Sequence, residues 1–172
     1  MHDAGDIYEY VVMYIDDLLA IMKDPKSFFD VLESNVHNYK LKNVGPPKYH
    51  LGADYFHDMD GTLCMGAQTY VKCLLKNFEL LYGELPQKEM SPLNKDDHPD
   101  LDTSEFCIPD EITKFYSMIG TCQWMITLCC MDIAHAIMSL NQFCTVLHVG
   151  HVECLKHIIG YVSEFPHAAT CF

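Results

Sequence analysis

Apolar residues form two short runs near the start of the chain, Tyr10–Met13 and Leu18–Met22. Runs of this length that are rich in apolar and β-branched residues are typical of buried strands. Between them lies Tyr14-Ile15-Asp16-Asp17, and aspartate is common in tight turns. The pattern therefore predicts a hairpin of two buried strands with both aspartates at its turn.

Further along, the pattern predicts a helix, a second hairpin and another helix. Pro25 suits the first turn of a helix, Asp60-Gly61 is a strong hairpin-loop signal, and Gly83 is a suitable helix C-cap. The predicted elements are a helix over 25–38, strands over 49–57 and 62–65, and a helix over 68–81.

Residues 83–109 are rich in Pro, Asp, Glu and Lys and lack periodicity, which predicts a linker. Three helices are expected after it, over 110–128, 132–145 and 149–164, with Phe115, Ile119, Trp124 and Leu128 in the core. We therefore predict an α+β fold with three parts: 1–82 with the hairpins, the linker 83–109, and a helical unit over 110–172.

The uncharged stretch from Phe115 to Met131 is just long enough to span a membrane. Polar residues interrupt it and no basic flank follows, so a buried helix is the better interpretation. The chain also begins without the basic and apolar segments of a signal peptide. We expect an intracellular protein, cytoplasmic or nuclear and not secreted, without a membrane partner.

Nine cysteines in a chain of this kind predict reduced thiols rather than a disulfide framework. His148-x-x-His151 is the only histidine spacing that resembles a metal site, and it lacks further ligands at the usual distances. No glycine-rich phosphate loop is present.

The formal charge is −13, with 11 basic residues against 24 acidic ones. Nucleic-acid binding depends on cations that neutralise phosphates. The nearest thing to a basic cluster is Lys40, Lys42 and Lys48. The composition therefore predicts weak contact with nucleic acid or none.

Two chemical interpretations of Asp16 and Asp17 remain open from the residues alone. A pair of aspartates can simply form a hairpin turn. Alternatively, carboxylates held at the end of an apolar hairpin suit a hard cation such as Mg²⁺, which is widely used in phosphoryl transfer.

From Tyr8 to about Val162 the sequence resembles the reverse transcriptase of copia-type retrotransposons. The strongest match is Tyr14-Ile15-Asp16-Asp17 with the Tyr-x-Asp-Asp box of that family, and the other matches follow in the family's order. They are Lys48-Tyr49-His50-Leu51-Gly52, Gln68-x-Tyr70-Val71, Ser91-Pro92-Leu93, Tyr116-x-x-Ile119-Gly120-x-x-x-Trp124, Asp132-Ile133-Ala134 and His151-x-x-x-Leu155-Lys156.

This resemblance implies a partial polymerase palm, made of antiparallel hairpins and helices, followed by a small helical thumb or connection unit. Asp16 and Asp17 would be catalytic and would bind Mg²⁺. Tyr14 would support the substrate side of the site. Tyr49, Leu51 and Gly52 would help to hold the primer, and the partners would be a template-primer and a deoxynucleoside triphosphate.

The family's first palm aspartate would lie on a strand upstream of the hairpin, where this sequence has only residues 1–7. Asp3 and Asp6 are too close to the hairpin to replace it. Because two-metal chemistry needs a full set of ligands, we expect this chain alone not to polymerise DNA. The alternatives are a degenerate or co-opted binding or scaffold domain, and a fragment completed in trans. Bare hairpin strands would favour self-association.

All eleven basic residues are lysines, so arginine is absent, while Cys (9) and His (10) are abundant. Deamination of methylated CG turns arginine codons into codons for cysteine, histidine and other residues, which explains the missing arginine and the abundant Cys and His. We therefore interpret the chain as a decaying retrotransposon remnant. Codons that are more than one transition from CGN at Cys129, Cys130, Gln142, Cys144, Cys154 and His157 would contradict this interpretation.

Overall fold

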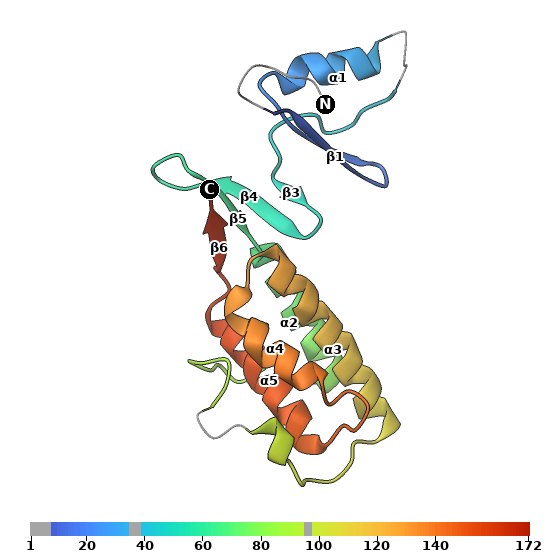
Figure 1. Ribbon diagram of the computed structural model, residues 1–172, viewed down its shortest axis with the longest axis vertical. Coiled ribbons are helices and arrows are strands. Elements are labelled where there is room, and N and C mark those ends of the chain that lie inside the picture. Colours follow the sequence, from blue (N-terminus) through green and yellow to red (C-terminus); the bar gives the residue numbers. More distant parts are fainter. Residues whose placement is uncertain (1–7, 35–38, 95–97) are drawn as a thin grey trace. The chain divides into compact units, whose positions relative to one another are not determined.

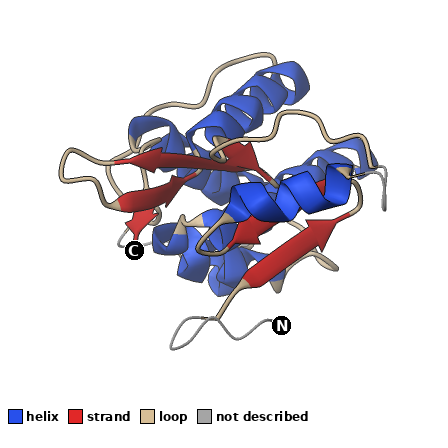
Figure 2. Ribbon diagram, turned by 90° about the horizontal axis from the view of Figure 1, so that it is seen from above, coloured by secondary structure: helices blue, strands red, loops and turns tan. Residues whose placement is uncertain are grey.

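The computed structural model describes residues 8–34, 39–94 and 98–172. Helices and antiparallel strands are both present in these residues (Figure 2). The chain forms two compact units, Met1–Pro47 and Lys48–Phe172, which are described separately. Asp3, Asp6 and the predicted end of the first helix at residues 35–38 lie outside the described residues.

The first unit contains strands β1 (Tyr10–Tyr14) and β2 (Asp17–Ile21) and helix α1 (Pro25–Glu33) (Figure 1). The strands pair antiparallel, which confirms the predicted hairpin. Asp24 caps α1, because its Oδ1 accepts a hydrogen bond of 3.3 Å from the amide of Ser27. The helix ends at Glu33, and Ser34 is its C-cap.

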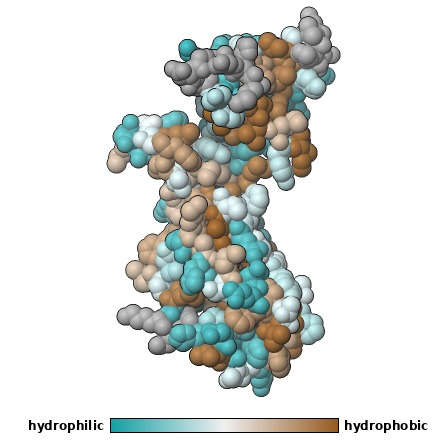
Figure 3. All heavy atoms as spheres, in the orientation of Figure 1, coloured by the Kyte–Doolittle hydropathy of each residue, from teal (hydrophilic) through white to brown (hydrophobic). Residues whose placement is uncertain are grey.

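The prediction that both hairpin strands are buried is wrong. Every residue of β1 is exposed, and β2 is at most half-buried. The sheet has only two strands, and a lone hairpin cannot cover its own faces. Apolar residues consequently reach the surface of this unit (Figure 3), with Met13 exposed by 74%.

In the second unit, a four-stranded antiparallel sheet has the order β3-β4-β5-β6. Its strands are β3 (Tyr49–His50), β4 (Ala53–His57), β5 (Leu63–Gly66) and β6 (Ala169–Cys171). The predicted hairpin loop is present between β4 and β5. The single strand predicted over 49–57 is wrong, because Leu51 and Gly52 form a turn with positive φ angles of 52° and 95°.

Four helices pack below this sheet: α2 (Gln68–Tyr82), α3 (Pro109–Leu128), α4 (Ala134–Asn141) and α5 (Val149–Glu164) (Figure 1). Short 3₁₀ turns, η1 (Pro99–Leu101) and η2 (Met131–Ile133), precede α3 and α4. Gly83 ends α2 in the left-handed conformation, as predicted. The helix predicted over 132–145 is instead η2 followed by α4, which ends at Asn141.

One apolar core joins all four helices. Its large buried side chains include Phe78 from α2, Phe115 from α3, Ile137 from α4 and Ile158 from α5. Helix α2 packs against α3 and α5, and its buried residues are Val71, Leu74 and Phe78. The division of the chain at Pro47 therefore differs from the predicted division at 83–109.

The described part of segment 83–109 lies against α5 rather than connecting two separate bodies. A side chain at Gly160 would collide with the carbonyl oxygen of Gln87, and one at Gly150 would collide with the Asp102 carboxylate. The segment is also held by a 2.8 Å ion pair between Lys88 and Glu164. The segment is irregular, and hydrophobic periodicity cannot reveal that it packs closely on two glycines of α5.

The prediction that all cysteines are reduced is wrong for one pair, because Cys64 and Cys171 form a disulfide. The two residues are direct partners across β5 and β6, and their Cα atoms are 4.1 Å apart. The sequence pattern did not predict β6, so it could not place these cysteines together. The other seven cysteines are not disulfide-bonded: Cys73, Cys107, Cys122, Cys129, Cys130, Cys144 and Cys154. Among the residues described, no helix combines the length and apolarity needed to cross a membrane.

Candidate functional site

The two predicted metal ligands lie at the tip of the first hairpin. Tyr14 pairs with Asp17, which leaves Ile15 and Asp16 as a two-residue loop. Ile15 has a φ of 54°, an uncommon conformation for a β-branched residue. Directly paired residues project to the same face of a sheet, so the side chains of Tyr14 and Asp17 are neighbours.

The aspartates are exposed, and Tyr14 is 50% exposed. Two adjacent carboxylates can offer oxygen ligands to a hydrated divalent cation. In the part of the chain that the structure describes, no third His, Cys, Asp or Glu joins Asp16 and Asp17 in a cluster suited to a metal ion. Asp16 and Asp17 can therefore supply only part of the ligand set that Mg²⁺ needs.

The predicted primer-holding residues lie in the second unit, at the turn between β3 and β4. This turn is anchored to α3, because the indole Nε1–H of Trp124 donates a 3.3 Å hydrogen bond to the carbonyl oxygen of Leu51. Tyr49 is 53% exposed. The structure thus places Tyr49 at the start of β3, close to the turn that Leu51 and Gly52 form.

Trp124 was predicted to be a core residue, yet it is 44% exposed. Its ring instead packs over the turn, where the Nε1 atom would lie 3.3 Å from a Cβ at Gly52. Leu128 and Tyr70 approach the same position to 3.2 and 3.3 Å. Sequence reasoning missed this role because helical spacing alone does not distinguish a core face from a face that holds a turn.

Replacing Gly52 with alanine is expected to destabilise the second unit by about 1–3 kcal/mol. The alanine would have to keep the φ of 95°, which a Cβ disfavours, and its Cβ would press on three side chains. The measurement is urea unfolding followed by circular dichroism.

Gly61 supplies the matched control, because its φ is 87° but nothing lies within 4 Å of its would-be Cβ. Gly61→Ala should therefore show the backbone cost alone. If both variants lose the same free energy of unfolding, the packing of the turn on α2 and α3 does not contribute to stability.

The two histidines with metal-like spacing are engaged in local structure. The Nδ1 of His151 accepts a 3.1 Å hydrogen bond from the amide of His148, and its Nε2 lies 2.8 Å from the carbonyl oxygen of Pro99. His151 is buried and stacks on Phe143. This pair caps the start of α5.

Asp132 belongs to the matching motif Asp132-Ile133-Ala134, and it links η2 to α5. The hydroxyl of Tyr161 donates a 2.7 Å hydrogen bond to its Oδ2. That hydrogen bond is the main reason why the pKa of Tyr161 rises to about 12. Asp132 thus has a structural partner within the second unit.

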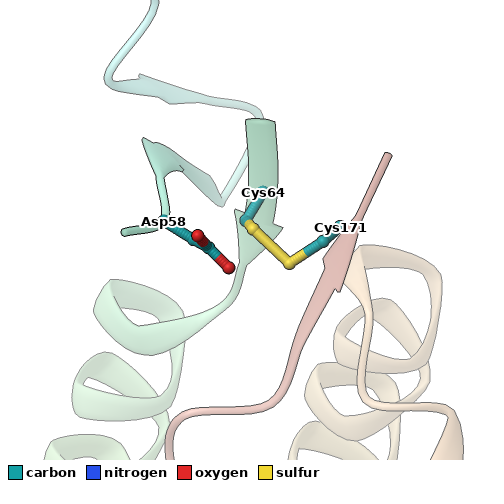
Figure 4. Close-up of side chains that lie close together, drawn as sticks. All are labelled: Asp58, Cys64 and Cys171. Carbon is teal, nitrogen blue, oxygen red and sulfur yellow. A yellow bond between two sulfur atoms is a disulfide. The ribbon is translucent and has the colours of Figure 1, made fainter. Parts of the chain in front are cut away.

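A cluster that sequence reasoning did not identify joins Asp58, Cys64 and Cys171 (Figure 4). No signal in the sequence could have revealed it, since it depends on β6 pairing with β5.

Comparison with known proteins finds similarity to transposon proteins. The chain is 22% identical to a transposon Ty5-1 protein of Saccharomyces cerevisiae, over 89% of this chain and 48% of that protein. It is 23% and 22% identical to retrovirus-related Pol polyproteins from transposon RE1 of Arabidopsis thaliana and transposon TNT 1-94 of Nicotiana tabacum. The chain is related to retrotransposon Pol polyproteins.

The two Pol matches cover 94% of this chain but only 11% and 12% of the polyproteins. The chain thus spans about half of the first relative and about a tenth of the other two. No protein-family model and no solved structure matches the chain.

Proposed function

We propose that the chain is a fragment of a copia-type retrotransposon RNA-directed DNA polymerase that carries half of the Mg²⁺-binding site. The observation that carries this proposal is the pair Asp16 and Asp17 at the tip of a two-residue hairpin loop. Similarity to retrotransposon Pol polyproteins along most of the chain supports it.

In this proposal, Asp16 and Asp17 supply carboxylate oxygens to Mg²⁺. Tyr14 lies beside Asp17 and lines the substrate side. The first unit is then part of a polymerase palm. The turn at Tyr49, Leu51 and Gly52 contacts the primer backbone, and the helices of the second unit act as a thumb or connection.

Two-metal nucleotidyl transfer requires ligands that hold the ions about 3.5–4 Å apart. The described residues place only Asp16 and Asp17 at the hairpin tip, with no third ligand of the metal-binding types clustered there. We therefore propose that the chain is inactive alone and binds Mg²⁺ weakly.

Primer extension tests the activity directly, with the purified chain, Mg²⁺, a primed RNA template and four deoxynucleoside triphosphates. We expect no extension from the wild type or from Asp16→Asn. Asp30→Asn is a matched control, since Asp30 is an exposed acid on α1 of the same unit. Extension that Asp16→Asn abolishes and Asp30→Asn preserves would contradict the proposed inactivity.

The metal-binding half of the proposal has its own test. Mn²⁺ should broaden the NMR signals around Ile15 and Asp16 selectively, and Asp16→Asn with Asp17→Asn should remove that effect. Broadening centred elsewhere would reject the hairpin as a metal site.

A second candidate function is a non-catalytic binding or scaffold domain. The exposure of the apolar hairpin favours it, together with the net charge of −13. Large exposed apolar patches commonly mark interaction surfaces.

If the hairpin associates with other hairpins, the mass measured by analytical ultracentrifugation should rise with protein concentration. Met13→Lys should reduce this association, because it places a charge on the exposed strand. Met59→Lys is the control, since Met59 is fully exposed in the other unit. A monomer at all concentrations would contradict the expectation.

A further inference from the structure

Three potential metal ligands meet at one end of the four-stranded sheet. Asp58 follows β4, Cys64 lies in β5 and Cys171 lies in β6. A carboxylate oxygen and the two sulfur atoms all lie within 4.8 Å of one another. Figure 4 shows the Asp58 carboxylate directed toward the sulfur atoms.

The backbone holds each ligand in place. The amide of Asp58 donates a 3.0 Å hydrogen bond to Thr62, which closes the β4–β5 loop. The amide of Asp60 donates a 2.7 Å hydrogen bond to Oδ1 of Asp58, which orients the carboxylate. Cys64 and Cys171 are direct cross-strand partners, and the amide of Phe172 donates to the carbonyl of Leu63 beside them.

We propose that the reduced form of this cluster is a Zn²⁺ site, with two thiolates and one carboxylate oxygen as ligands and water in the fourth position. Thiolate and carboxylate are both established Zn²⁺ ligands. The site goes beyond the proposed polymerase function, since it lies in the other compact unit and uses different residues.

The chemistry has two steps. A phosphine reductant and water convert the disulfide into two thiols and a phosphine oxide. Zn²⁺ then replaces the two thiol protons, which pass to solvent. Oxidised and metal-bound forms are therefore mutually exclusive states of the same cysteine pair.

The geometry suits this exchange. Zn–S bonds of about 2.3 Å in a tetrahedral site place two sulfurs roughly 3.8 Å apart. Reduction breaks the bond between the two sulfurs and lets them separate to that spacing, and a carboxylate oxygen of Asp58 already lies within 4.8 Å of both. Cys64 is buried while Asp58 and Cys171 are exposed, so the ion can enter from solvent on one side.

Two of the other thiols, Cys122 and Cys130, compete poorly for the ion. Burial raises the pKa of Cys122 to about 12 and raises that of Cys130 further, which disfavours the thiolate that a metal requires. Among the described residues, no other group of three metal-ligating side chains is this close together.

The test uses the full chain, reduced with a phosphine, with Zn²⁺ binding measured by competition against a chromophoric chelator. Co²⁺ in place of Zn²⁺ reports thiolate ligation through its charge-transfer absorption. We expect one ion per reduced chain and none per oxidised chain. Because both forms share one sequence, this comparison does not depend on any variant folding.

Variants then assign the ligands. Cys171→Ser should abolish the charge-transfer band, and Asp58→Asn should weaken Zn²⁺ binding by about tenfold or more. Asn keeps the oxygen that accepts from Asp60. Cys73→Ser and Asp30→Asn are controls that should bind as the wild type does, since Cys73 is exposed and Asp30 is an exposed acid of the other unit. No binding by the reduced chain, unchanged binding in Asp58→Asn, or equal binding by the Cys64→Ser/Cys171→Ser double variant would overturn the proposal.

Discussion

Phe78→Ala is expected to lower the free energy of unfolding of the unit 48–172 by about 3–5 kcal/mol. Phe78 is 1% exposed and belongs to the core that α2 shares with the later helices. Truncation would leave a cavity at the junction of α2 with α3 and α5. The loss should therefore extend to the whole unit, and amide hydrogen exchange should accelerate in α3 and α5 as well as in α2.

Leu80→Ala on the same helix is the control, because Leu80 is 75% exposed. It should change stability by less than about 0.5 kcal/mol. Faster exchange confined to residues 68–82 in Phe78→Ala would instead support the predicted division at 83–109, with α2 outside the later helical unit.

Reduction of Cys64–Cys171 is expected to destabilise the same unit by about 2–4 kcal/mol in the absence of metal. The two cysteines are 107 residues apart, so the disulfide closes a loop that includes nearly the whole unit. Loops of that size restrict the unfolded chain most strongly in the chain-entropy account. Urea unfolding of oxidised and reduced protein, with a chelator present, measures the difference.

Cys171→Ser should match the reduced wild type and should no longer respond to the reductant. Cys73→Ser should behave as the oxidised wild type does, since Cys73 is exposed and forms no disulfide. If reduction leaves the unfolding midpoint unchanged, the disulfide does not contribute to stability. Added Zn²⁺ should restore stability to the reduced chain only if the proposed metal site exists, so the two effects can be measured separately.

Helices whose ends are specified by nearby residues could be predicted from the sequence. Helix α5 is found over the predicted residues, and α2 ends at the predicted glycine. In both cases the boundary is set by nearby residues, through helical periodicity and a C-cap. The predicted strand over 49–57 failed at Leu51-Gly52, because its turn is stabilised by Trp124, which lies more than seventy residues away.

In the candidate site too, local features could be predicted from the sequence and long-range ones could not. Asp16 and Asp17 were placed at a hairpin turn from the flanking apolar runs, and the structure has them there. The burial that the apolar runs predicted for those strands was wrong, because burial depends on which other strands cover them. The function of Trp124 as an anchor for the turn at Gly52 was equally out of reach of periodicity.

By itself, the sequence determined the hairpin with its two aspartates, the positions of α2, α3 and α5, and the relation to retrotransposon Pol proteins. These features depend on residues close together along the chain, or on their order. Only the tertiary structure decided that α2 joins the later helices, that segment 83–109 packs on α5, and that Asp58, Cys64 and Cys171 meet. The reason is that each of these contacts joins residues far apart in sequence, and no local preference specifies such partners.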